Sequence, residues 1–221
     1  PILLLSDGAG SAAISEQGAQ TLVTGILRLL ITLEDALSPW LDTPCPAEDE
    51  LMTWSRRILL HAQGLLNDLA ESQRRSVRDV RATLLLAVLG KQRSFWWQVG
   101  DGMIVVQQAD TTRVLTQTGQ SKGEFANQTC FIDSARLEDV QCGLLNSQEI
   151  FGLSLMSDGG AEKLVAHDGS RVAPRINGWF DQLRQRQLSA DKLAVAYHEP
   201  PMWERSSLDD RSVVLAARPD R

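Results

Sequence analysis

The sequence predicts an α+β fold in which antiparallel sheets are covered by helices. Apolar residues recur at helical spacing across two long segments, at about residues 15–37 and 47–74. A block of short apolar runs follows them, separated by polar or glycine-containing turns, and this indicates antiparallel strands. Helices and strands therefore occur in separate blocks rather than in alternating β-α-β units, which is typical of an α+β domain.

The individual elements follow from apolar runs and their boundaries. The chain opens with an apolar run at residues 2–6, whose length indicates a buried strand. Both long helices are amphipathic, and Ser15 is placed to cap the first. Strands are then expected at residues 82–89, 94–99, 103–108, 113–115, 129–132, 140–144, 151–156 and 212–217. The remaining helices are expected at about residues 161–166, 176–187 and 189–197.

Composition limits the classes of function. The 221 residues are 43% hydrophobic and 23% charged, which suits one globular domain with a large core. A net charge of −6 without a long basic stretch argues against nucleic-acid binding. No apolar run reaches the roughly 18 residues of a membrane span, and the first run lacks the features of a signal peptide. Three cysteines without a C-x-x-C pair indicate reduced thiols, so we expect a cytoplasmic protein without disulfides or structural zinc.

Asp-Gly pairs are the most informative local feature of the sequence. Three of the four pairs follow an apolar run directly, and a further acidic pair precedes the last apolar run. A carboxylate at the end of a strand, next to a glycine carbonyl, is a good ligand set for Mg²⁺ or Mn²⁺. The four pairs and the further acidic pair are Asp7-Gly8, Asp101-Gly102, Asp158-Gly159, Asp168-Gly169 and Asp209-Asp210.

The same pairs also have a purely structural interpretation. Asp-Gly is a favoured dipeptide of tight hairpin turns, and Asp101-Gly102 stands between two expected strands, where a type I′ turn fits well. Asp7 and Asp158 fit that interpretation less well, because a predicted helix follows each of them. Spacing alone leaves both interpretations open.

Four ordered motifs resemble those of the type-2C metal-dependent Ser/Thr protein phosphatases, the PPM family. They are S-D-G-A-G-S at residues 6–11, V-G-D-G at 99–102, M-S-D-G-G at 156–160 and D-D-R-S-V-V at 209–214. Thr83 also matches a threonine that the family carries in the strand after its helical block. The G-D-G form of the second motif and G-E-F-A-N-Q-T at residues 123–129 are similar to the small, enterobacterial-like bacterial members.

The resemblance implies a fold and a metal centre. The fold is an α-β-β-α sandwich of two antiparallel sheets flanked by helix pairs. The centre holds two Mn²⁺ or Mg²⁺ ions, which Asp7 bridges and the Gly8 carbonyl helps to bind, while Asp158 and Asp209 complete the shell. These three carboxylates are the implied catalytic residues.

Further site residues are implied less directly. Asp210 stands where many members carry Asn, and would support the ligands or act as an alternate one. Asp101 would help to hold a weaker third ion, although Glu162 stands where an Asp often shares that ion. In the stretch at residues 123–129, three side chains either face the site and touch substrate or metal-bound water, or cap a loop: Glu124, Asn127 and Thr129.

The implied activity is hydrolysis of phosphate monoesters on phosphorylated proteins, in partnership with a cognate Ser/Thr kinase. In such enzymes a water bridging the two ions attacks phosphorus in line. The family's first strand, with its phosphate-binding arginine, would precede Pro1, so we expect residues 1–221 to form a single type-2C-like domain that lacks that strand. Two alternatives stay open: a weak or inactive relative that binds phosphorylated partners or regulates a kinase, and an acidic domain with structural Asp-Gly turns.

Overall fold

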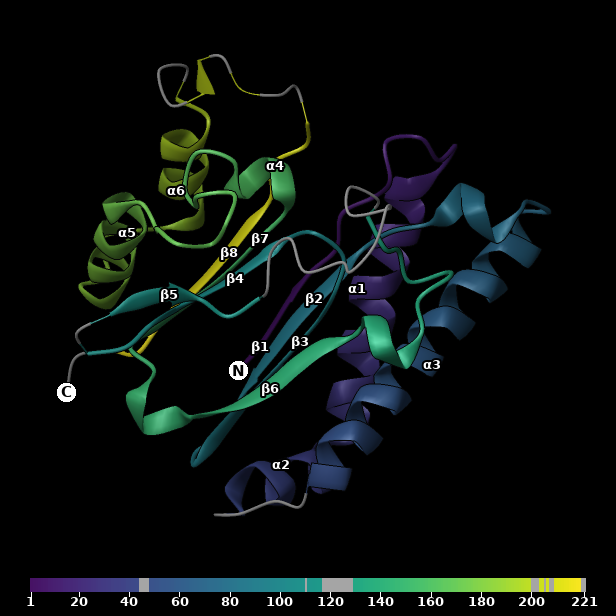
Figure 1. Ribbon diagram of the computed structural model, residues 1–221, viewed down its shortest axis with the longest axis horizontal. Coiled ribbons are helices and arrows are strands. Elements are labelled where there is room, and N and C mark those ends of the chain that lie inside the picture. Colours follow the sequence, from purple (N-terminus) through teal and green to yellow (C-terminus); the bar gives the residue numbers. More distant parts are fainter. Residues whose placement is uncertain are drawn as a thin grey trace. The chain divides into compact units, whose positions relative to one another are not determined.

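A computed structural model describes residues 1–43, 48–109, 111–116, 129–199, 203–204, 206 and 209–219. The chain divides into two compact units, Pro1–Asp101 with Asn127–Gln148 and Gly102–Ala126 with Glu149–Arg221. We call them unit 1 and unit 2. Each contains one four-stranded antiparallel sheet and its own helices (Figure 1). The predicted α+β class, with two antiparallel sheets and flanking helices, is therefore confirmed.

The sheet of unit 1 has the strand order β1-β2-β3-β6. Its register aligns Leu4 with Leu86, Leu86 with Trp97, and Trp97 with Cys142. Trp97 is fully buried whereas its neighbour Trp96 is only half-buried, as expected from the alternation of side chains along a strand. The four strands are β1 (Ile2–Leu5), β2 (Leu84–Leu89), β3 (Arg93–Val99) and β6 (Gln141–Asn146).

Three α-helices bury their apolar faces in the core of unit 1. In α1 (Ser15–Thr32) and α3 (Glu48–Ser72), leucines and isoleucines at helical spacing pack with the apolar side chains of β2 and β3. These two helices lie side by side in Figure 1. Short 3₁₀ turns complete the unit: η1 (Val77–Val80), η2 (Leu137–Asp139) and η3 (Ser147–Glu149).

The single helix predicted at residues 15–37 is wrong, because the chain turns at Leu33 and continues as α2 (Glu34–Asp42). The turn lets Leu37, Trp40 and Leu41 enter the same core. Apolar residues keep their helical spacing through Leu33, so periodicity cannot detect the break. The predicted cap is also wrong: Ser15 is the first helical residue, and Ile14 occupies the cap position without a side-chain hydrogen bond.

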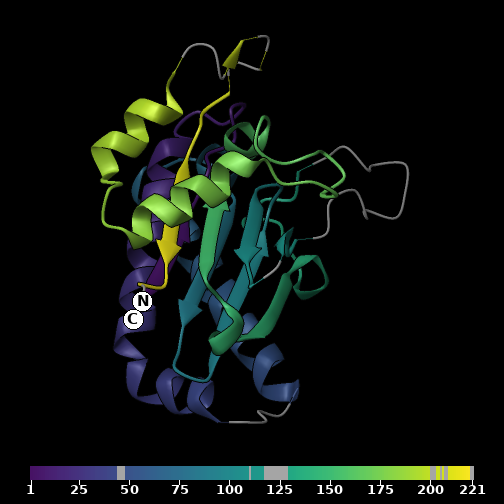
Figure 2. The same ribbon diagram turned by 90° about the vertical axis from the view of Figure 1, so that its left-hand side faces the viewer.

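The sheet of unit 2 has the strand order β5-β4-β7-β8. Figure 2 shows β8, in yellow, beside the green strand β7. Apolar side chains of α5, among them Trp179 and Phe180, form a core with Val105 and Met156 of the sheet. The strands are β4 (Met103–Gln107), β5 (Thr112–Val114), β7 (Gly152–Met156) and β8 (Val213–Ala217), and the helices are α4 (Asp158–Ala161), α5 (Pro174–Arg184) and α6 (Ala190–Tyr197).

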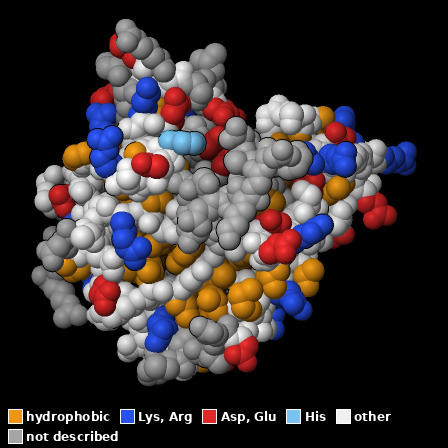
Figure 3. All heavy atoms as spheres, in the orientation of Figure 1, with side chains coloured by type: hydrophobic (Ala, Val, Ile, Leu, Met, Phe, Trp, Pro, Cys, Tyr) orange, Lys and Arg blue, Asp and Glu red, His pale blue; other side chains and the backbone are white. Residues whose placement is uncertain are grey.

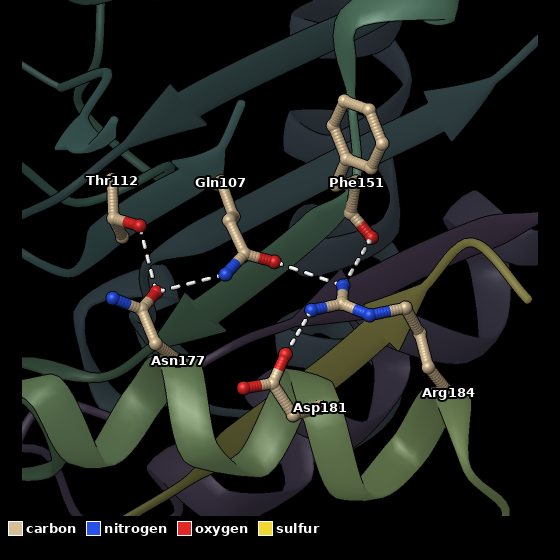
Figure 4. Close-up of polar contacts among 6 residues, drawn as sticks. All are labelled: Gln107, Thr112, Phe151, Asn177, Asp181 and Arg184. Atoms are coloured by element: carbon tan, nitrogen blue, oxygen red, sulfur yellow. Dashed lines mark hydrogen bonds and ion pairs between the residues drawn. The ribbon is translucent and has the colours of Figure 1, made fainter. Parts of the chain in front are cut away.

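A polar network fastens α5 to the strands of unit 2 (Figure 4). Arg184 donates hydrogen bonds to the Gln107 side-chain oxygen at 2.9 Å and to the Phe151 carbonyl at 3.2 Å. Asn177 Oδ1 accepts from Gln107 at 3.1 Å and from the Thr112 hydroxyl at 2.7 Å. These bonds satisfy polar groups at the partly buried contact between helix and sheet.

Three local predictions are wrong. Residues 129–132 form no strand, and Ile132 instead donates one backbone hydrogen bond to the Ala82 carbonyl at 3.0 Å. The helix expected at 161–166 occurs earlier, as the four-residue α4. The Asp101-Gly102 pair closes no hairpin, because β3 belongs to the sheet of unit 1 and β4 to that of unit 2.

Gly18 gives a stability prediction for unit 1. A Cβ at this position of α1 would lie 1.9 Å from the Val80 carbonyl oxygen, so Gly18→Ala must push the helix away from η1. We expect it to lower the free energy of unfolding by about 1–3 kcal/mol, as overpacking does. Chemical denaturation measures the change.

The matched control is Gly64→Ala in α3, where a Cβ would meet no atom within 4 Å. Alanine there should raise the free energy of unfolding by up to about 1 kcal/mol through helix propensity. Equal denaturation midpoints for Gly18→Ala and the unaltered chain would contradict the tight contact between Gly18 and Val80.

Candidate functional site

Asp7 follows strand β1 in unit 1, and its backbone N–H and carbonyl both form hydrogen bonds with Thr83. The Asp7 N–H donates to Thr83 Oγ1 at 3.1 Å, and the Thr83 N–H donates to the Asp7 carbonyl at 2.8 Å. Ser6 Oγ donates to the Thr83 carbonyl at 2.5 Å. Thr83 is buried, so this ladder fixes the backbone that carries the Asp7 carboxylate.

Gly8 continues the same loop where no larger residue fits. A Cβ at Gly8 would lie 2.7 Å from both Cβ and Oγ of Ser15, the first residue of α1. Gly8 also forms an isolated bridge with Ala82, and the Ala9 N–H donates to the Arg81 carbonyl at 3.1 Å. The Asp7-Gly8 loop is therefore held between the start of α1 and the segment that precedes β2.

Asp101 is exposed at the end of β3 and accepts a short hydrogen bond from the Thr129 hydroxyl. Gly100, just before it, has φ +123° and packs on Thr83, because a Cβ there would lie 2.6 Å from the Thr83 side chain. The structure thus brings Asp101 and Thr129 together. The other two residues of the 123–129 prediction, Glu124 and Asn127, lie outside the described residues.

An ion pair anchors the segment that follows Thr129. Arg81 Nη2 lies 3.0 Å from Asp133 Oδ2. The Cζ atom of the same guanidinium lies over the Phe131 ring, 5.4 Å from the ring centroid. Cys130, just before Phe131 in the sequence, is half-buried, and its burial, followed by the nearby carboxylates of Asp139 and Asp133, raises its pKa to about 11. This thiol is therefore protonated at neutral pH and a poor nucleophile.

Asp158 is the first residue of α4 in unit 2, directly after the cap residue Ser157. The buried Ser157 hydroxyl accepts a hydrogen bond from the Gly160 N–H at 3.2 Å. The Gly159 N–H donates to Asp158 Oδ1 at 2.7 Å. Glu162, at the other end of this short helix, is exposed and donates its N–H to the Asp158 carbonyl at 3.1 Å.

Ser157 also joins the Asp158 turn to the acidic pair that precedes β8. Its N–H donates to the Ser212 carbonyl at 3.1 Å, its hydroxyl donates to the Asp210 carbonyl at 3.2 Å, and it accepts from the Ser212 N–H at 3.1 Å. Ser157 belongs to the motif at residues 156–160, but the motif predicted no role for its side chain. A serine just before Asp158-Gly159, in the cap position of a helix, was the signal for one.

The contact between the two acidic segments is close. A Cβ at Gly159 would lie 2.6 Å from the Asp210 carbonyl oxygen and 3.0 Å from Asp209 Cβ. Asp209 and Asp210 are exposed, and Asp158 is half-buried. The structure therefore brings Asp158-Gly159 and Asp209-Asp210 together within unit 2.

The candidate carboxylates are divided between the units: Asp7 and Asp101 lie in unit 1, and Asp158, Asp209 and Asp210 in unit 2. Among the described residues, no three or more His, Cys, Asp or Glu side chains form a group that could hold a metal ion. The donors are carboxylates beside backbone carbonyls, the oxygen ligands that Mg²⁺ and Mn²⁺ prefer. Within unit 2, the carboxylates of Asp158, Asp209 and Asp210, whose backbones meet at Gly159, are donors of this class and fit a divalent cation.

Comparisons with known proteins agree with this chemistry. Residues 1–196 match the family model described as Protein phosphatase 2C. No curated protein sequence is similar enough to count as a match. In the described part of the chain, no helix has both the length and the apolar character that crossing a bilayer requires.

Solved phosphatases share the fold. The Staphylococcus aureus serine/threonine phosphatase Stp1 is 15% identical, with a TM-score of 0.62 over 99% of this chain and 84% of that one. The Mycobacterium tuberculosis phosphatase PstP/Ppp is 14% identical, with a TM-score of 0.63 over 99% and 88%. The PstP catalytic domain in complex with two manganese ions is 16% identical, with a TM-score of 0.61 over 99% and 88%.

At such identities the solved structures establish the fold alone, whereas the family model covers most of the sequence. The motif order, the Asp158 and Asp209-Asp210 contact and the family match agree with one another. The chain belongs to the protein phosphatase 2C family.

Proposed function

We propose that this chain is a metal-dependent protein phosphatase that hydrolyses phosphate monoesters of phosphorylated Ser and Thr side chains. The observation that carries the proposal is the set of hydrogen bonds from Ser157 to Asp210 and Ser212. These bonds hold the Asp158 turn against the Asp209-Asp210 segment. Membership of the protein phosphatase 2C family supports the reaction class, and the two manganese ions bound by the PstP catalytic domain support the choice of metal.

The acidic residues described above are the proposed ligands of two Mn²⁺ or Mg²⁺ ions. They are the carboxylates of Asp7, Asp158 and Asp209 and the carbonyl of Gly8, with Asp210 as an alternate ligand. Asp101, which Thr129 contacts, is the proposed ligand of a third, weaker ion. Bound divalent cations supply an acidified water and offset the charge on the phosphoryl oxygens.

The protein's own part in this chemistry is to hold oxygen ligands in fixed positions. Thr83 holds the Asp7 backbone at two points, and Ser157 holds the Asp158 turn and the Asp210 carbonyl. These contacts restrain the backbone next to the proposed ligands, and restrained ligands need little reorganisation when an ion binds. The half-buried Cys142 is also a thiol whose pKa is raised by burial, so neither described cysteine is activated as a nucleophile.

The finer parts of the proposal concern relatives and partners. The S-D-G-A-G-S and G-E-F-A-N-Q-T stretches support a place among the small bacterial members of the family. Phosphorylated proteins are the proposed substrates, and a Ser/Thr kinase that modifies the same proteins is the proposed opposing enzyme.

Phosphate release measured on the purified chain tests the proposal. With Mn²⁺ or Mg²⁺ it should hydrolyse a small aryl phosphate and phosphoserine and phosphothreonine peptides, and a chelator should stop the reaction. Tight binding of phosphopeptides without turnover under any divalent cation would instead favour the inactive, partner-binding alternative. A phosphotyrosine peptide of the same sequence measures the side-chain preference.

A further inference from the structure

Tyr197, at the end of α6 in unit 2, reaches the turn that carries Asp158. Its side chain is buried, and its hydroxyl donates a hydrogen bond to the Gly160 carbonyl at 2.8 Å. Burial raises the pKa of Tyr197, so the hydroxyl keeps its proton and remains a donor at neutral pH. It is the only tyrosine of the chain, and it lies outside the motifs that resemble those of the phosphatases.

The fit between Tyr197 and Gly160 is tight. A Cβ at Gly160 would lie 2.4 Å from the Tyr197 hydroxyl oxygen and 2.6 Å from the Ser212 carbonyl oxygen. Gly160 N–H is bonded to Ser157, so the peptide groups on both sides of this residue are held. A shift of Tyr197 would therefore be passed to Asp158, two residues earlier in the same short helix.

Tyr197 also contacts Trp203, which in turn stacks with Arg211. The Trp203 ring lies edge-on to the Tyr197 ring, with centroids 5.3 Å apart, and the Trp203 indole N–H donates to the Tyr197 carbonyl. The Arg211 guanidinium lies 4.3 Å from the Trp203 ring centroid and donates to Ser206 Oγ at 3.0 Å. Arg211 directly follows Asp209-Asp210, so the stack joins α6 to the second acidic segment.

We propose that Tyr197 is a positioning residue for the metal ligands of unit 2. It acts through the Gly160 carbonyl to fix the Asp158 turn, while Trp203 and Arg211 hold Tyr197 and the Asp209-Asp210 segment in place. The inference rests on the proposed function, because it concerns ligands assigned there. It predicts that loss of one hydroxyl outside the ligand set weakens metal binding.

The test compares Tyr197→Phe with Thr112→Val. Each variant removes one hydroxyl that donates one hydrogen bond in unit 2, but the Thr112 hydroxyl bonds to Asn177 on α5 and not to the Asp158 turn. Calorimetric titration of the metal-free chain with Mn²⁺ should give a dissociation constant raised roughly tenfold for Tyr197→Phe, the size typical of lost ligand support. Thr112→Val should change it by less than about twofold, since it removes no such support.

Two further readouts separate positioning from general loss of stability. In Tyr197→Phe, kcat for an aryl phosphate should fall while KM stays near its original value, because the substrate groups are untouched. Amide hydrogen exchange of residues 159–162 should be faster in the metal-free variant than in the unaltered chain, whereas exchange in β4 should be unchanged.

Each outcome decides a specific point. Unchanged Mn²⁺ affinity in Tyr197→Phe would overturn the positioning role and leave the proposed function intact. No Mn²⁺ binding by the unaltered chain would overturn both. Should Tyr197→Phe fail to fold, Trp203→Phe, which keeps a ring but loses the indole N–H, must weaken Mn²⁺ binding in the same direction, and unchanged affinity there would overturn the role.

Discussion

Asp158→Asn should lower Mn²⁺-dependent phosphate release by on the order of a thousandfold, because a metal ligand that stabilises the transition state by several kcal/mol loses its charge. Asparagine has the shape of aspartate, and its side-chain oxygen can still accept the Gly159 N–H, which now donates to Asp158 Oδ1 at 2.7 Å. The turn should therefore keep its structure. Initial rates at saturating Mn²⁺, with circular dichroism of the same samples, measure the effect.

Asp168→Asn is the matched control, because it makes the same change in another Asp-Gly pair of unit 2. Asp168 is exposed, and its carboxylate accepts hydrogen bonds from the Ser170 N–H and hydroxyl, which lower its pKa. It belongs to no proposed ligand set, so activity should stay near that of the unaltered chain. Full activity in Asp158→Asn, or an equal loss in both variants, would contradict the role assigned to Asp158.

The contact at Asp158 shows what sequence could and could not predict. The apolar run before Asp158-Gly159 and the apolar run after Asp209-Asp210 both predicted strands, and β7 and β8 confirm them. Their contact depends on antiparallel pairing in a register that aligns Met156 with Val213. No spacing within the chain specifies that register, and the expectation that these carboxylates meet came from the family resemblance.

Other features depend on tertiary context that a local pattern does not contain. Asp101-Gly102 between two strands has the same local pattern whether the strands pair with each other or enter different sheets, and here they enter different sheets. Tyr197 lies outside every recognised motif, and its proposed positioning role depends on a hydrogen bond to a residue 37 positions away. Tyr197 could therefore be identified only from the structure, whereas Ser157 stands inside the motif at residues 156–160 and only its bonding partners needed the structure.

Gly159→Ala should lower Mn²⁺ affinity and kcat by on the order of a hundredfold, the size of effect that a ligand displaced by about 1 Å can produce. The new Cβ would lie 2.6 Å from the Asp210 carbonyl oxygen and 3.0 Å from Asp209 Cβ, and the first of these distances is too short for any real contact. The Asp158 turn and the Asp209-Asp210 segment must therefore separate. Titration with Mn²⁺ and steady-state rates on one preparation measure both effects.

The control for Gly159→Ala must add the same methyl group without displacing a ligand. Gly178, in α5, is suitable because a Cβ there would meet no atom within 4 Å, and alanine should raise the free energy of unfolding by up to about 1 kcal/mol. Gly178→Ala should bind Mn²⁺ like the unaltered chain. If Gly159→Ala is folded yet also binds Mn²⁺ normally, the close approach of Asp209 and Asp210 to Asp158 has no part in holding the metal, and the ligand set of unit 2 must be assigned differently.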